Sequence, residues 1–140
     1  MRVRTMGVGA LVLVVVVCAA ALLAACGGGS GGATIKVTEA DNTKTLAAEV
    51  GDEISVTLKE NPTTGYGWNM IAGLGLTAVS DEFTGPSPSS SPMMGAGGVH
   101  TWVFKVDQAG TLTLTGVYAR SWESESKSAA DFSLIVDATE

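Results

Sequence analysis

Residues 53–59, Glu-Ile-Ser-Val-Thr-Leu-Lys, alternate strictly between polar and apolar side chains. Ile54, Val56 and Leu58 therefore share one face of an extended strand, and the polar residues share the other. The Gly51-Asp52 pair in front of this stretch is typical of a turn. The segment is predicted to be a half-buried β-strand, and it sets the pattern for the rest of the domain.

Similar alternation recurs after Ala33, and no long stretch there has the 3.6-residue apolar spacing of an amphipathic helix. Residues 46–50 fit either a short strand or a single turn of helix. Seven or eight short strands in a region of about 105 residues, separated by frequent turns, predict an all-β fold in the form of an antiparallel β-sandwich. The further strands are predicted around 35–37, 67–72, 76–83, 99–107, 112–118 and 132–136.

The overall composition averages two unlike regions. The chain has 140 residues, enough for one domain, and a formal net charge of −6, yet its mean hydropathy is positive, +0.32. Residues 7–25 carry no charge, whereas all 14 acidic residues lie beyond Cys26, where six basic residues accompany them and the net charge is −8. A domain this acidic is not expected to bind nucleic acid, which requires basic side chains to neutralise phosphates.

The first 26 residues have the three parts of an export signal: basic residues at Arg2 and Arg4, an apolar stretch at Val8–Val17, and small residues before Cys26. The uncharged run of 19 residues is long enough for a transmembrane helix, but no basic stop-transfer cluster follows it. The final four residues, Leu-Ala-Ala-Cys, resemble the lipobox of bacterial lipoproteins. This resemblance favours a lipoprotein over a transmembrane helix.

The lipoprotein resemblance implies that residues 1–25 are removed as a signal peptide and that the Cys26 thiol is diacylated, which suffices for stable membrane attachment. Residues 26–33 then form a lipid-anchored Gly/Ser tether, and residues 34–140 form the domain, on the extracytoplasmic side of a membrane of the bacterial cell envelope. Cys18 leaves with the leader. The mature chain is therefore expected to have no disulfide, no cysteine nucleophile and no cysteine metal site.

Three loops of the predicted sandwich are expected to meet at one end. They are Asn61–Tyr66, the loop ending in Gly95–Gly98, and Arg120–Trp122. Two strands separate each loop from the next, and in an up-and-down order two strands return the chain to the same end of a sandwich. Residues 84–92, before the second loop motif, are rich in Pro and Ser and cannot join a sheet.

The composition of these loops favours binding. In the first, Pro62 fixes φ and Gly65 permits a positive φ on either side of two threonines, so the loop is expected to be rigid. In the second, the glycines allow a close backbone approach to a partner. The third contains Arg120 and Trp122, residue types enriched in interface hot spots. Each loop alone fits ordinary turn chemistry, and Trp122 alone fits a satellite core position, but their coincidence at one end favours a binding site.

The same three segments resemble the motifs of the chagasin-type inhibitors of papain-like cysteine peptidases. The resemblance extends from about Ile35 to Val136, and it implies an immunoglobulin-like sandwich whose loops enter the peptidase cleft without covalent chemistry. The matching segments are Asn61-Pro62-Thr63-Thr64-Gly65-Tyr66 followed by Trp68, which is similar to the family signature; Gly95-Ala96-Gly97-Gly98, which matches Gly-x-Gly-Gly; and Arg120-Ser121-Trp122, where the family has Arg-Pro-Trp.

The resemblance also implies a role for each loop. Thr63 and Thr64 are expected nearest the catalytic Cys–His pair, and Gly95–Gly98 are expected to line the non-primed side of the cleft. Arg120 and Trp122 are expected to grip the primed side. Ser121 in place of Pro leaves the third loop less restricted, which is expected to weaken binding. The expected partners are a papain-like peptidase and, through the lipid anchor, a membrane; the expected state is a monomer without cofactor or metal.

Catalysis by the domain itself is not expected. His100 is the only histidine, and it shares an apolar strand face with Trp102 and Phe104, which favours a structural role. No second histidine or free thiol could complete a metal site with it, and the domain, residues 34–140, contains no Gly-x-Ser-x-Gly nucleophile motif. The acidic segment 123–127 fits a solvated hairpin tip.

Two other binding functions remain open from the sequence. An adhesion or assembly module of the cell envelope would use the same loops on a partner that is not a peptidase. A chaperone-like sandwich would need an exposed apolar edge strand, which the residue pattern does not reveal.

Overall fold

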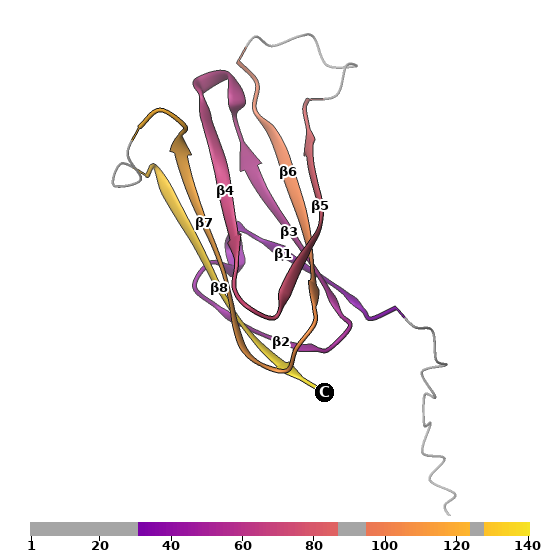
Figure 1. Ribbon diagram of the computed structural model, residues 1–140. Helices are drawn as coiled ribbons and strands as arrows, with labels where there is room; N and C mark the ends of the chain where they lie inside the picture. The colour runs from indigo at the N-terminus through magenta and orange to yellow at the C-terminus, as the bar shows by residue number, and fades with distance from the viewer. Residues whose placement is uncertain (1–30, 87–94, 124–127) are drawn as a thin grey trace, which may run out of the picture.

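The computed structural model describes residues 31–86, 95–123 and 128–140. In these residues the chain forms two four-stranded sheets that pack face to face (Figure 1). One sheet has the strand order β1-β3-β6-β5 and the other β2-β8-β7-β4. The elements are β1 (Thr34–Thr38), the 3₁₀ turn η1 (Glu39–Asp41), β2 (Thr45–Glu49), β3 (Glu53–Glu60), the 3₁₀ turn η2 (Pro62–Thr64), β4 (Tyr66–Ala72), β5 (Leu76–Thr84), β6 (Gly98–Val106), β7 (Gly110–Arg120) and β8 (Ala130–Thr139).

The prediction of an all-β sandwich with seven to eight strands is confirmed, and the ambiguous segment 46–50 belongs mostly to strand β2. The predicted antiparallel pairing holds for β3–β6, β5–β6, β4–β7 and β7–β8. At the edges, β1 pairs in parallel with β3 and β2 pairs in parallel with β8, so both sheets are mixed. The path of the chain is the reason. It crosses to the second sheet as β2 between β1 and β3, and β1 and β3 therefore run in the same direction.

The apolar side chains at alternate positions of the strands form the core between the two sheets. In β3, Ile54, Val56 and Leu58 are completely buried, as the residue pattern predicted. Leu114 of β7 and Leu134 of β8 join the same buried cluster from the second sheet. Burying a side chain of this size stabilises the fold by about 1.5–3 kcal/mol. The described domain therefore depends on its apolar core.

The turn before β3 closes the end of the sandwich at which the described chain begins. Gly51 has a φ of 99°, and the Asp52 backbone N–H donates to the Glu49 carbonyl. The buried Asp52 carboxylate accepts hydrogen bonds from the backbone N–H groups of Glu49 and Ala33, each at 2.8 Å. These bonds attach Ala33 to the turn between β2 and β3.

Several sequence predictions concern residues outside the described part of the chain. They are the signal peptide 1–25, the anchor Cys26, most of the tether 26–33, and parts of the segments 84–92 and 123–127. Among the described residues, no helix is both long enough and apolar enough to span a membrane.

Truncation of the core is expected to be costly. Leu114→Ala should lower the free energy of unfolding by about 2–5 kcal/mol, because it opens a cavity between the two sheets. Ile135→Ala is the matched control, since Ile135 lies on the exposed outer face of β8, and its effect should stay within about 1 kcal/mol. Chemical denaturation of both variants measures the difference. Equal losses would contradict the assignment of the core.

Candidate functional site

Three connections meet at the upper end of the sandwich in Figure 1, as the parity of the strands predicted. They follow β3, β5 and β7. We call them the first, second and third loops. The residues singled out from the sequence all lie in these loops or in the adjoining ends of strands; they are Asn61, Pro62, Thr63, Thr64, Gly65, Tyr66, Gly95, Ala96, Gly97, Gly98, Arg120 and Trp122.

The first loop is stiffened by its own hydrogen bonds. Its turn η2 ends at Gly65, which has the positive φ predicted for it, 81°. The Thr63 hydroxyl donates to the side-chain oxygen of Asn61 at 2.6 Å, and the Thr64 hydroxyl donates to the Asn61 carbonyl at 2.7 Å. Pro62, Thr63 and Thr64 are nevertheless exposed. The loop therefore presents a preformed surface to solvent.

Asn61 also connects the first loop to the second. Its side-chain N–H donates to the Gly95 carbonyl at 3.0 Å. Gly95 has a φ of 89°, and the space where a Cβ would lie is open, so the backbone conformation alone requires glycine there. This bond fixes the spacing between the two loops near their exposed ends.

Gly97 and Gly98 are required by packing within the protein. Gly98 begins β6 between β3 and β5, and a Cβ on it would lie 2.3 Å from the Thr84 carbonyl oxygen. A Cβ on Gly97 would lie 2.9 Å from the Glu60 carbonyl oxygen. The close backbone approach expected of this loop is thus made, in the free protein, to the neighbouring strands.

Arg120 connects the first loop to the third. It is the last residue of β7, opposite Tyr66, and its guanidinium carbon lies 4.5 Å from the centre of the Tyr66 ring. Its Nε–H donates to the Thr64 carbonyl at 3.3 Å, and a terminal N–H donates to the Glu123 carboxylate at 3.4 Å. A cation–π contact at an exposed site contributes about 0.5–1 kcal/mol. Arg120 therefore positions the first loop as well as carrying a charge at this end.

Trp122 is 69% exposed, yet its ring covers Gly65. A Cβ on Gly65 would lie 2.2 Å from the nearest ring atom, so a larger residue there would displace the ring. This exposure excludes the alternative of a satellite core position for Trp122. The ring rests on the first loop and leaves most of its surface open to a partner.

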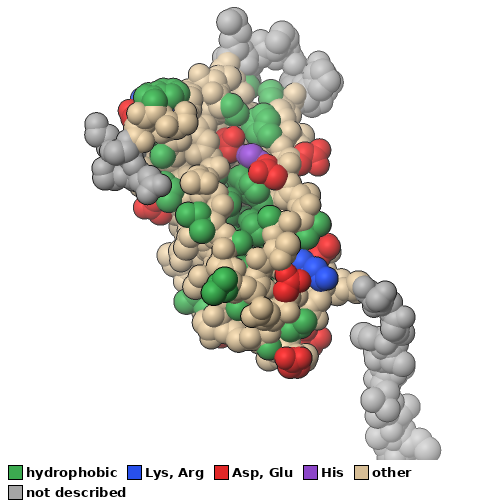
Figure 2. All heavy atoms as spheres, in the orientation of Figure 1, with side chains coloured by type: hydrophobic (Ala, Val, Ile, Leu, Met, Phe, Trp, Pro, Cys, Tyr) green, Lys and Arg blue, Asp and Glu red, His purple; other side chains and the backbone are tan. Residues whose placement is uncertain are grey.

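A hollow of about 470 Å³ lies beside the first loop. The rings of Tyr66 and Trp68 and the charged side chains of Glu60 and Arg120 are among its lining groups. Figure 2 shows hydrophobic side chains exposed at this end of the molecule. The projecting loop thus borders a concave surface that offers apolar area and both signs of charge, as a protein-binding site requires.

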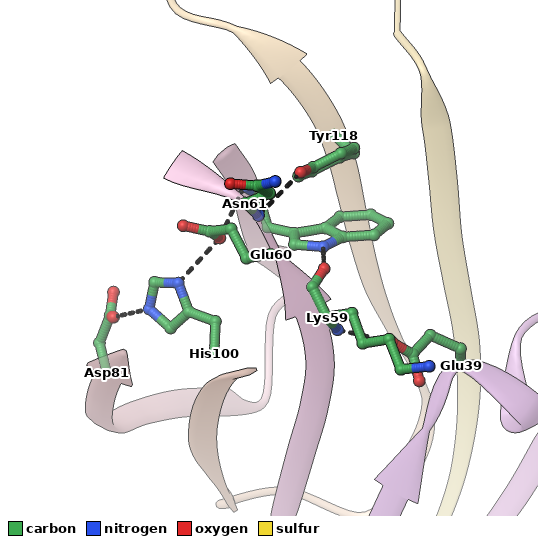
Figure 3. A network of polar contacts seen from close by, with 8 residues as sticks. Glu39, Lys59, Glu60, Asn61, Asp81, His100 and Tyr118 are labelled. Atoms are coloured by element: carbon green, nitrogen blue, oxygen red, sulfur yellow. Dashed lines mark hydrogen bonds and ion pairs between the residues drawn. The ribbon is translucent and has the colours of Figure 1, made fainter. Parts of the chain in front are cut away.

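Below the loops, a polar network joins the strands that carry them (Figure 3). The Trp68 backbone N–H donates to the Glu60 carboxylate at 3.1 Å, and the Trp68 indole N–H donates to the Lys59 carbonyl at 2.9 Å. The Asn61 backbone N–H donates to the Tyr118 hydroxyl at 3.0 Å. Both ends of the first loop are therefore fixed to neighbouring strands.

His100 shares the inner face of β6 with Trp102, as predicted, but two carboxylates that were not predicted also contact its ring. Its ring stacks on Trp102 with the ring centres 3.9 Å apart, and its two nitrogens bond to Glu60 and Asp81. Burial lowers the pKa of His100, but the hydrogen bonds to Asp81 and Glu60, with the charges of both carboxylates, outweigh burial and raise the pKa above its ordinary value. Figure 2 shows this histidine with acidic side chains on both sides. The described residues contain no group of three or more side chains arranged to bind a metal ion.

Glu60, Asp81 and Tyr118 were not predicted from the sequence to belong to this site. A signal existed for Glu60, because it continues the alternation of β3 onto the inner face, where a carboxylate needs hydrogen-bond donors. No comparable signal existed for Asp81. A β-bulge between Ala78 and Ser80 shifts the register of β5, and as a result Asp81 rather than Ser80 shares the inner face with Trp102.

Comparisons with known proteins agree with this arrangement. Residues 47–136 match the family model described as chagasin family peptidase inhibitor I42. Chagasin from Trypanosoma cruzi is 33% identical over 106 residues, which make up 74% of this chain and 96% of chagasin. Amoebiasin-2 from Entamoeba histolytica is 31% identical over 87 residues, 62% of this chain and 71% of that protein.

Solved structures share the fold. The crystal structure of a cysteine protease inhibitor from Entamoeba histolytica has a TM-score of 0.68 and 28% identity, over 76% of this chain and 96% of that one. The solution structure of amebosin has a TM-score of 0.62 and 27% identity, over 78% of this chain and 100% of that one. The matched model describes inhibitors, in agreement with the prediction that the domain is not an enzyme. The chain therefore belongs to the chagasin family of peptidase inhibitors.

Proposed function

We propose that the protein is a reversible, non-covalent inhibitor of papain-like cysteine peptidases and that it blocks the active-site cleft with its three loops. The direct linkage of the loops carries this proposal, since Asn61 bonds to Gly95 and Arg120 bonds to Thr64. Loops connected in this way form one preformed edge. Such an edge loses little conformational entropy on docking, so more of the contact energy contributes to affinity.

The first loop occupies the centre of the cleft in this proposal, with Thr63 and Thr64 nearest the catalytic Cys–His pair. Its tip is the 3₁₀ turn Pro62–Thr64 rather than an extended strand, and both threonine hydroxyls are bonded to Asn61. This geometry keeps the peptide bonds of the tip away from a near-attack position. The loop can therefore bind the peptidase without being cleaved.

The other two loops lie on either side of the first. We place Gly95–Gly98 on the non-primed side of the cleft and Arg120 with Trp122 on the primed side. The exposed Trp122 ring offers a large, rigid contact area at low entropic cost. Ser121 is expected to leave the third loop freer than a proline would, and so to weaken this contact.

An adhesion module that uses the same loops has no comparable support. The matching family model and the crystal structure from Entamoeba histolytica both belong to peptidase inhibitors. Inhibition is therefore the function that we conclude for the domain.

We further propose that the inhibitor is exported and anchored through a lipid on Cys26 to the extracytoplasmic side of a bacterial envelope membrane, as a monomer. The Leu-Ala-Ala-Cys sequence at the end of an uncharged run of 19 residues supports this location. The glycine-rich residues 27–32 support a flexible tether between the anchor and the domain.

Titration of papain with residues 33–140, which contain every described strand, should abolish peptidase activity. The inhibition should be reversible because no bond forms between the two proteins. Residual activity against inhibitor concentration, followed by recovery on dilution, measures both properties. No inhibition of papain and of cathepsin L-type enzymes at micromolar protein would exclude the proposed function.

Variants of the first and third loops should locate the site. Trp122→Ala should weaken inhibition by about 2 kcal/mol, roughly 30-fold in Ki, because it removes the exposed ring. Thr64→Arg should weaken inhibition at least as much, since the longer arginine side chain cannot fit between the loop and the peptidase. Leu74→Ala is the control, because Leu74 is 94% exposed in the β4–β5 turn at the other end of the sandwich. A similar loss in all three variants would contradict the assignment of the loops.

Replacement of the anchor residue tests the location. In a bacterial host, the full chain should incorporate labelled palmitate and partition into detergent, whereas Cys26→Ser should do neither because it lacks the thiol. Cys18→Ser is the matched control and should behave as the original chain does. Palmitate labelling of Cys26→Ser at the original level would refute the anchor.

A further inference from the structure

His100 joins the strands that carry the first and second loops. It lies on the inner face of β6, close to Gly98, where the second loop ends. Its Nδ1 is 2.9 Å from a carboxylate oxygen of Glu60 on β3, and its Nε2 bonds to a carboxylate oxygen of Asp81 on β5 (Figure 3). Glu60 directly precedes the first loop, and β5 leads into the second. One imidazole ring therefore bridges the stems of both loops.

The two contacts of the ring require a proton on each nitrogen. An ionised carboxylate only accepts hydrogen bonds, and a neutral imidazole has a single N–H to donate. A neutral ring would leave one nitrogen lone pair facing a carboxylate oxygen. The imidazolium donates to both carboxylates at once, and both hydrogen bonds are then charge-assisted.

The two carboxylates differ in how firmly they are fixed. Glu60 is 9% exposed and also accepts the Trp68 backbone N–H. Asp81 is 68% exposed and faces the ring only because of the bulge in β5. When the ring loses one proton, the remaining N–H is expected to stay on the buried Glu60, because an unpaired buried carboxylate is costly. Asp81 is then free to turn into solvent.

The titratable groups that contact the ring come from two strands. Glu60 faces it from β3 and Asp81 from β5. In the second sheet, Trp68 of β4 packs against the apolar core, and the hydroxyl of Tyr118 on β7 is used by the Asn61 backbone N–H. The two carboxylates are therefore the charges that govern the protonation of the ring.

We propose that protonated His100 is a positioning residue for the inhibitory loops: it links the stems of the first and second loops, so that peptidase binding is tightest while the ring is charged and weakens when the ring loses its proton. This inference rests on the proposed inhibitory function. It gives a role to His100, Glu60 and Asp81, none of which enters the cleft in the proposed complex.

The direction of the pH dependence follows from the surroundings of the ring. Burial lowers the pKa of His100, but the bonds to Asp81 and Glu60 raise it above the ordinary value of about 6.5. The link that His100 makes between the two loop stems is therefore fully formed below about pH 6.5, and it is lost as the pH rises through the raised pKa of the ring.

The linkage can be measured directly, because the chain contains a single histidine. In the full chain, kept in detergent micelles, NMR titration of the labelled ring should give a midpoint above about 6.5. The backbone amides of Thr64 and Gly95 should shift with the same midpoint. Asp81→Asn should lower the midpoint of the ring. Glu82→Gln, which removes a carboxylate from the opposite face of the same strand, should leave it unchanged.

Inhibition of papain by the same full-length proteins tests the consequence. Below the midpoint of the ring, Asp81→Asn should inhibit about three- to tenfold less tightly than the original chain. Above the midpoint the two Ki values should converge, because the original chain has then lost the same link. Comparing both proteins at each pH cancels the titration of papain itself. Glu82→Gln should match the original chain throughout, and His100→Gln should inhibit without this pH dependence.

Three results would overturn the inference. The first is a ratio of Ki values for Asp81→Asn and the original chain that stays constant across the midpoint, since a purely structural role would give this result. The second is a ring midpoint at or below the ordinary value, and the third is loop amides that do not follow the ring. If none of the proteins inhibits papain at any pH, the inhibitory function fails instead, and the titration of ring and amides still decides the linkage.

Discussion

The carboxylate of Glu60 lies where the apolar core ends and the loops begin, and the upper end of the sandwich is organised around it. The inward register of β3, which buries Ile54, Val56 and Leu58, also turns Glu60 inward. A buried carboxylate is costly unless donors surround it. Here the donors are the backbone N–H of Trp68 and the ring of His100. The need to satisfy one charge thus fixes the start of β4 and the start of β6 relative to β3.

The loops above this point depend on each other through the first loop. Asn61 bonds to the second loop, while Arg120 and the Trp122 ring reach the first from the third. The second and third loops are therefore positioned by the same short turn. A change in that turn is expected to displace both neighbours, which makes the three loops one binding element rather than three independent ones.

The sequence predicts the layers and the position of the loops because both follow from local rules. Alternation identifies a strand, as in residues 53–59, and the parity of successive strands places three loops at one end. The parallel pairing of β1 with β3 could not be predicted in this way, because it depends on which edge of which sheet the chain reaches. The contact between His100 and Asp81 could not be predicted either. Continued alternation from Leu76 and Ala78 would turn Ser80 inward, and only the bulge turns Asp81 inward instead.

The bond between Ala33 and Asp52 holds the start of the domain at the end opposite the three loops. The chain enters the domain at one end, and the loops lie at the other, beyond strands such as the 11-residue β7, which is about 36 Å long. With the proposed anchor at Cys26, the eight residues 26–33 add at most about 28 Å of reach. The loops, at the end of the domain opposite the tether, could then reach some tens of ångströms from the lipid. In that arrangement the binding edge would be free to meet a peptidase at some distance from the membrane surface.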